Sequence, residues 1–187
     1  MVILNIRKYK PEDKQQLVKI CLLNADLEDD SKPIGKYIEL MFCLYYIEKE
    51  PENCFVATDE NDIPVGYVYG SSDFMKYKTD IQPYIEKIAE IDNGKYLPDA
   101  EVEMYNHYIY YNDYPAHLHI DILENYRGGG TGSELIKNYC MNLKNKGING
   151  VMLIVGSDNK RGRNFYEKNG FVLLNDKPSG AAYGKKI

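Results

Sequence analysis

The sequence has no tryptophan, few histidines and no closely spaced cysteine pair. Its four cysteines are Cys21, Cys43, Cys54 and Cys140. Their scatter does not match the C-x-x-C spacing of a metal or redox site, so we expect reduced core thiols, a cytoplasmic protein and no bound metal. The apolar start MVILNI is too short for a secretory signal, and no later apolar run is long enough to cross a membrane.

Positive charge is also scarce, because 23 lysines and arginines face 28 acidic residues, giving a net charge of −5. This balance gives no reason to expect a nucleic-acid partner, and any site for an anion must be built from local groups. The length of 187 residues, with 44% hydrophobic and 27% charged residues, is typical of a soluble globular protein. We therefore expect a single domain spanning 1–187.

Hydrophobic periodicity predicts alternating strands and helices. The predicted strands are 2–8, 55–58, 65–71, 116–123, 151–155, 171–174 and 182–186. The predicted helices are 11–25, 36–48, 81–91, 133–146 and 161–169. The elements from 116 to 155 read strand, helix, strand, which predicts a parallel βαβ unit with a right-handed crossover.

Glycines are concentrated in the stretch YRGGGTG, residues 126–132, between the first strand and the helix of that unit. A helix start offers unpaired N–H groups and the positive end of the helix dipole, and glycines let the main chain approach a ligand closely. These properties predict a site for a pyrophosphate. Its predicted ligands are Arg127, Gly128, Gly129, Gly130, Thr131, Gly132 and the Ser133 hydroxyl.

Three glycine-rich phosphate motifs are candidates for this loop. A P-loop needs a lysine directly after its last glycine, where this chain has Ser133. A dinucleotide loop is followed about 20 residues later by an acidic residue, where this chain reads GINGVMLIV. The pattern Arg-x-x-Gly-x-Gly is met by Arg127, Gly130 and Gly132, and it resembles the pyrophosphate motif of the acyl-CoA-binding GNAT acetyltransferases.

Further segments carry the same resemblance. NKRGRNFYEKNGF, residues 159–171, is similar to the next GNAT motif, Asn-x-x-Ala-x-x-Phe-Tyr-Glu-Lys-x-Gly-Phe, with Gly162 in place of alanine. IRKYKPEDKQQLVKI resembles the first strand and helix of the family, and VGYVYG its third strand. Within the family, YPAHLHID and, more loosely, CLYYIEKEP resemble bacterial acetyltransferases related to the C-terminal domain of O-GlcNAc hydrolases.

The resemblance implies an α/β GNAT fold, with a mixed, twisted sheet that is flanked by helices and splayed where acyl-CoA enters. It implies transfer of an acetyl group from acetyl-CoA to an amine of a small molecule or protein, by direct attack in a ternary complex. By the same resemblance, the main-chain N–H of Ile122 or Leu123 stabilises the oxyanion, Asn159 belongs to the cofactor site, and Tyr166 contacts the cofactor and serves as the acid. Lys160, Arg161 and Arg163 either attract the 3′-phosphate or form a solvated helix face.

The strand HLHIDI supplies the candidates for a base. Side chains alternate between faces, so His117, His119 and Asp121 share one face and the three apolar residues share the other. We predict that His119 and Asp121 deprotonate the amine, directly or through water; the alternative is a hydrogen-bonded structural network. The HLH pair also resembles that of the arylalkylamine acetyltransferases, although its spacing to the arginine differs by one residue. Cys140 lies on the apolar side of its helix and is expected in the core.

The sequence says less about the side of the site that would bind the acceptor amine. Residues 72–115 form a long connection that ends in YNHYIYYNDY, in which tyrosine is frequent. It is interpreted as an aromatic wall over the acceptor, a surface hairpin or a homodimer contact. Two functions remain open: an acetyl-CoA-dependent N-acetyltransferase, and a catalytically silent acyl-CoA-binding or protein-interaction module with the same fold.

Overall fold

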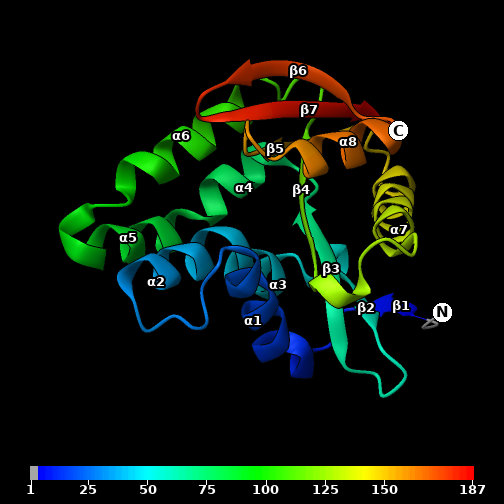
Figure 1. The fold of residues 1–187 in the computed structure, drawn as a ribbon. Coiled ribbons are helices and arrows are strands. Elements are labelled where there is room, and N and C mark those ends of the chain that lie inside the picture. Colours follow the sequence, from blue (N-terminus) through cyan, green and yellow to red (C-terminus); the bar gives the residue numbers. More distant parts are fainter. Residues whose placement is uncertain (1–3) are drawn as a thin grey trace.

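The computed structural model describes residues 4–187 and contains a seven-stranded sheet of order β1-β2-β3-β4-β5-β7-β6 (Figure 1). The strands are β1 (Asn5–Lys8), β2 (Phe55–Thr58), β3 (Pro64–Ser71), β4 (Ala116–Ile122), β5 (Gly150–Val155), β6 (Val172–Lys177) and β7 (Gly180–Lys186). β4 and β5 pair in parallel and the other described neighbours pair antiparallel. The predicted mixed α/β sheet is thereby confirmed; residues 2–3 of the first predicted strand lie outside the described residues.

Helices cover both faces of the sheet (Figure 1). They are α1 (Lys14–Asn24), α2 (Pro33–Glu39), α3 (Tyr45–Lys49), α4 (Phe74–Asp80), α5 (Gln82–Glu90), α6 (Leu97–Tyr108), α7 (Thr131–Asn145) and α8 (Lys160–Lys168). A π-helical turn, Leu40–Leu44, joins α2 to α3. α7 packs on β2, β3 and β4, α1 and α3 pack on the opposite face, and α8 contacts β6.

The connection between β3 and β4 folds as the three helices α4, α5 and α6. Asp73 caps α4, because its Oδ1 accepts hydrogen bonds from the amides of Met75 and Lys76 at 2.8 and 3.2 Å. Prolines in the first turns of α5 and α6 suit helix starts. The surface hairpin considered for this region is therefore wrong, since the tyrosine-rich segment is the end of α6 and the turn that follows it.

The two faces of the sheet have different cores. The core beneath α1 to α6 is rich in tyrosine, including the fully buried Tyr46, Tyr67, Tyr69 and Tyr77. The core beneath α7 is mostly aliphatic. The polar face predicted for β4 therefore looks into an aromatic interior whose hydroxyl groups can form hydrogen bonds.

β4 and β5 separate along their length. Their pairing is limited to Ala116 with Val151 and His117 with Met152, whereas β4 stays paired with β3 as far as Ile122 with Gly66. α7 crosses between β4 and β5, as the predicted βαβ unit requires. The Tyr139 hydroxyl of α7 donates to the His117 carbonyl oxygen at 2.8 Å and ties the helix to the paired half of β4. The other half of β4 has one side free in the middle of the sheet.

Candidate active site

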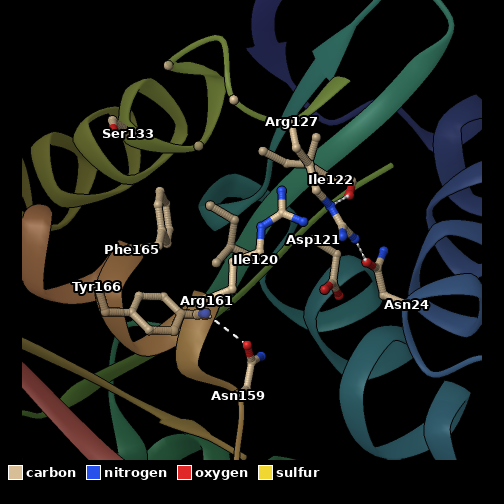
Figure 2. A pocket seen from close by; sticks show the side chains of 14 residues that line it. Asn24, Ile120, Asp121, Ile122, Arg127, Ser133, Asn159, Arg161, Phe165 and Tyr166 are labelled. Atoms are coloured by element: carbon tan, nitrogen blue, oxygen red, sulfur yellow. Dashed lines mark hydrogen bonds between the residues drawn. The ribbon is translucent and has the colours of Figure 1, made fainter. Parts of the chain in front are cut away.

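A cleft of about 570 Å³ lies beside the free half of β4 (Figure 2). It is lined by β4, the loop that follows, the start of α7, the first turns of α8 and the end of α1. Its lining residues are Asn24, Ile120, Asp121, Ile122, Arg127, Gly128, Gly130, Gly132, Ser133, Asn159, Arg161, Gly162, Phe165 and Tyr166. In Figure 2, Phe165 and Tyr166 lie on one side of the cleft, and Asp121 and Arg127 lie on the other.

The glycine-rich loop ends at the start of α7. Gly128 and Gly130 both have φ of +88°, a conformation that other residues rarely adopt. A Cβ atom at Gly128, Gly129 or Gly130 would meet no atom within 4 Å, so the surface of this loop is open. Because the helix begins at Thr131, the amides of its first turn have no partner within the helix. This arrangement offers N–H donors and a positive dipole to an anion in the cleft.

Gly132 has a different role. It is buried, and a Cβ atom there would lie 2.8 Å from Cζ of Phe165 and 3.4 Å from Cδ1 of Ile122. Glycine at this position therefore lets the start of α7 pack directly against α8 and β4. The loop combines open glycines that expose its main chain with one glycine that closes the packing beneath it.

Arg127 lines the cleft and is also exposed to solvent (Figure 2). Its Nε donates to the carbonyl oxygen of Ile122 at 2.6 Å, and a terminal nitrogen donates to Oδ1 of Asn24. The side chain thus connects the end of β4 with the end of α1 and places a permanent positive charge beside the glycine loop.

The three cations of the second motif separate in space. Arg161 lines the cleft, and Lys160 is exposed outside it. Arg163 points toward β6, where it pairs with Asp176 at 2.7 Å and donates to the Ser157 carbonyl at 3.0 Å. Asn159 caps α8, because its Oδ1 accepts from the Gly162 amide at 2.8 Å. A Cβ atom at Gly162 would lie 2.9 Å from Nδ2 of Asn159, so glycine leaves room for this cap.

The amides of β4 alternate between its two sides. The Leu123 amide donates to the carbonyl oxygen of Val65 at 2.9 Å, so it faces β3 and is occupied. The Ile122 amide consequently faces the other side, where β5 has separated. Of the two candidate oxyanion donors, Ile122 is the one oriented toward the cleft.

Asp121 brings a carboxylate to the cleft. The hydroxyl of Tyr67 donates a hydrogen bond to its Oδ2. Burial raises the pKa of Asp121 to about 6, although the Tyr67 hydrogen bond and the charge of Arg127 act in the opposite direction. Such a carboxyl group is largely ionised at neutral pH and is more basic than an exposed aspartate.

His119 is not part of the cleft lining. Its Nε2 and the Nε2 of His117 both contact the hydroxyl of Tyr46, at 3.1 and 3.0 Å. Burial lowers the pKa of His119 to about 4, partly offset by Glu103, and burial also lowers the pKa of His117 well below its usual value. Both imidazoles are therefore neutral at physiological pH and form the hydrogen-bonded network that was the alternative interpretation of this strand.

Tyr166 faces the cleft from α8. Its ring makes edge contacts with Phe165 and Phe171, which fix its orientation. Burial raises the pKa of Tyr166, and the nearby charge of Asp121 raises it further. The phenol therefore remains protonated and can donate a hydrogen bond into the cleft.

Most of the predicted residues come together at this cleft: Asp121, Ile122, Arg127, Gly128, Gly130, Gly132, Ser133, Asn159 and Tyr166. The predicted residues outside its lining are His119, Leu123, Gly129 and Thr131. Sequence reasoning missed Asn24, Ile120 and Phe165 as lining residues. Phe165 had a signal in the Phe-Tyr pair of its motif, and Ile120 in its place on the strand. Asn24 had none, because it reaches the site only through tertiary packing.

The tyrosines at the end of α6 do not line the cleft. Tyr105 and Tyr108 are 57% and 44% exposed, and the aromatic wall over the acceptor stays a prediction. Cys140 is partly buried in the aliphatic core, as predicted. Among residues 4–187, no cluster of three or more His, Cys, Asp or Glu side chains is arranged to hold a metal ion. None of the described helices combines the length and apolar character of a membrane span.

Comparison with known proteins identifies the family. Residues 20–171 match the model of the acetyltransferase (GNAT) family. N-alpha-acetyltransferase 30 of Schizosaccharomyces pombe is 28% identical over 162 residues, which cover 86% of this chain and 81% of that protein. The crystal structure of SsHAT is similar over 98% of both chains, with a TM-score of 0.84 and 26% identity. The PaiA N-acetyltransferase of Thermoplasma acidophilum, solved in complex with coenzyme A, matches over 99% of both chains with a TM-score of 0.60 and 17% identity. The chain belongs to the acetyltransferase (GNAT) family and is an acyltransferase.

Proposed function

We propose that this protein is an acetyl-CoA-dependent N-acetyltransferase that acts on an amine of a small molecule or protein by direct attack in a ternary complex. The observation that carries the proposal is the meeting of two features in one cleft. One is the open glycine loop at the start of α7, and the other is the free half of β4 with Asp121. The names of the relatives, an N-alpha-acetyltransferase and a coenzyme A complex, agree with it.

The chain's own groups fit this cosubstrate. The amides from Gly128 to Ser133 are the proposed donors to the pyrophosphate, and Arg127 and Arg161 add positive charge at the cleft. Acetyl-CoA supplies a thioester whose carbonyl carbon accepts the amine. The Ile122 amide is the proposed donor to the developing oxyanion, and a single such donor contributes about 3–4 kcal/mol of barrier stabilisation.

Proton movement is assigned to two residues. Asp121 is the proposed base, because it lines the cleft and its pKa of about 6 allows it to accept the amine proton at neutral pH. Tyr166 is the proposed hydrogen-bond donor to the departing thiolate. Since its pKa is raised above the usual value of about 10, it donates a hydrogen bond more readily than it gives up its proton to a thiolate of pKa about 8.5. His119, which lies outside the cleft lining, is proposed to act through water.

Two measurements test this function. Calorimetry with acetyl-CoA reports binding at the glycine loop, and free CoA thiol is then measured with small amines, polyamines and peptide N-termini as acceptors. Binding and acceptor-dependent thiol release are expected. Binding without release for any amine would favour the catalytically silent acyl-CoA-binding module, and absence of binding would leave only the protein-interaction module. A homodimer, a cytoplasmic location and the resemblance to relatives of O-GlcNAc hydrolases remain predictions.

A further inference from the structure

Tyr67 is a buried tyrosine with a single polar partner in the site. It lies on β3 directly opposite Asp121 on β4, in register, and its side chain is 0% exposed. Its hydroxyl donates to Oδ2 of Asp121. A phenol buried this deeply has a strong requirement for a partner, and here that partner is the carboxylate at the cleft.

The ring of Tyr67 is held in place by its neighbours. It stacks on Tyr69 with ring centroids 4.2 Å apart and planes inclined by 9°. Tyr69 stacks in turn on Tyr46, at 5.3 Å and 11°. Because these rings are packed face to face inside the aromatic core, the Tyr67 hydroxyl is a fixed donor that needs no reorganisation when a substrate binds.

This contact makes the two carboxylate oxygens of Asp121 different. Oδ2 is held by Tyr67, whereas hydrogen bonds within residues 4–187 leave Oδ1 without a protein donor. We propose that Tyr67 is a positioning residue for Asp121. Its hydrogen bond to Oδ2 orients the carboxylate so that Oδ1 accepts the proton of the acceptor amine. The proposal rests on the proposed function, since it assigns Asp121 the role of the base.

The same hydrogen bond lowers the pKa of Asp121, against the larger effect of burial. The titratable and charged groups around it are Tyr67 on β3, His119 on its own strand, Arg127 in the following loop, and Arg161 and Tyr166 on α8. Tyr67 and Arg127 favour the ionised carboxylate, while burial disfavours it. Removing the Tyr67 hydroxyl leaves burial less opposed, so the pKa of Asp121 must rise.

The decisive comparison uses Tyr67→Phe and Tyr69→Phe. Both changes remove one hydroxyl from the same buried stack, but the Tyr69 hydroxyl has no hydrogen-bond partner within residues 4–187. For Tyr67→Phe we expect the acid limb of the kcat–pH profile to move up by about one pH unit. At pH 6 this shift gives a roughly fivefold loss of kcat, with a smaller loss above pH 8 and an unchanged KM for acetyl-CoA. Tyr69→Phe is expected to keep the parent profile. The proposal would be overturned if the acid limb of the kcat–pH profile were the same for Tyr67→Phe and the parent, or if the two variants shifted it equally.

A second experiment needs neither turnover nor a folded Tyr67→Phe variant. The carbon-13 shift of the Asp121 carboxyl is titrated in the parent and in a protein with 3-fluorotyrosine at position 67. Fluorine keeps the ring shape but makes the phenol a stronger donor, so the Asp121 midpoint is expected to fall. An unchanged midpoint contradicts the positioning role. If the parent transfers no acetyl group, the proposed function fails while this titration still decides whether Tyr67 controls the carboxyl group.

Discussion

The two halves of β4 carry similar side chains on the same face but have different surroundings. At the paired half, His117 lies between β3 and β5, is 1% exposed and contacts the hydroxyl of Tyr46. At the splayed half, Asp121 has β3 on one side and the cleft on the other. Where β5 is paired with β4, the polar side chain is buried. Where β5 has separated, the polar side chain of Asp121 faces a cleft that a substrate can reach.

The electrostatics follow the same division. In the paired half, burial lowers the pKa of His117, so its imidazole stays neutral and serves as a hydrogen-bonding group. In the splayed half, burial raises the pKa of Asp121 to about 6, and its hydrogen bond and Arg127 keep it from rising further. Burial therefore acts against the charged form in both halves, but it leaves a usable base only where the strand is open.

The largest effect is expected from Asp121→Asn. The amide has nearly the same shape and still accepts the Tyr67 hydrogen bond, but it cannot accept the amine proton. We expect kcat to fall by about 10²–10⁴-fold, with acetyl-CoA affinity little changed. Single-turnover thiol release and calorimetry on the same sample separate the two quantities. A variant that retains a tenth of the parent rate would show that the splayed half does not supply the base.

The next largest effect is expected from Gly132→Ala. The added Cβ atom would meet Phe165 at 2.8 Å, so either α7 or α8 must shift. We expect a loss of about 1–3 kcal/mol in the free energy of unfolding and weaker acetyl-CoA binding by calorimetry. Gly129→Ala is the matched comparison, since its Cβ would meet open space and its φ is not positive. A greater loss of affinity at Gly129 than at Gly132 would contradict the packing role of Gly132.

Tyr166→Phe is expected to have an intermediate effect on turnover. The phenol stabilises the departing thiolate by a hydrogen bond, yet a thiolate can also leave without full protonation. We therefore expect kcat to fall by roughly tenfold, below the usual range for an acid catalyst, with KM nearly constant. Rates equal to the parent at every pH from about 6 to 9 would remove Tyr166 from the reaction.

The smallest effect on turnover is expected from His119→Gln, because His119 lies outside the cleft lining and contacts the hydroxyl of Tyr46. The amide can still contact the hydroxyl of Tyr46, so kcat should change by less than about threefold. Stability should respond to pH instead. Because the pKa of His119 is lowered to about 4 from 6.5, the unfolded chain takes up the proton first, and the parent loses stability as the pH falls from 6.5 to 4. Urea unfolding of the variant should show a shallower loss in this window, and a steeper one would be inconsistent with a neutral His119.

The sequence was informative where a local pattern determines the chemistry. The alternation in HLHIDI correctly placed His117, His119 and Asp121 on one face, and the strand–loop–helix context located the glycine loop. It was not informative where tertiary structure decides. The separation of β4 from β5 was expected only through the family resemblance, and the register that sets Tyr67 opposite Asp121 leaves no local signal. Of the helices between β3 and β4, α5 was predicted, whereas α4 and α6 were missed; tyrosine, frequent at the end of α6, favours strands by intrinsic preference.

The hydrogen bond from Tyr139 to the His117 carbonyl couples the two ends of the site. α7 carries the glycine loop at its start and is fastened through Tyr139 to the same strand that carries Ile122 and Asp121. This hydrogen bond therefore restrains the separation between the glycine loop and the free half of β4. Under the proposed function, a thioester ligand must span the distance from the glycine loop to Asp121. A ligand whose arm is too short or too long for this distance would not bring its carbonyl carbon to the free half of β4.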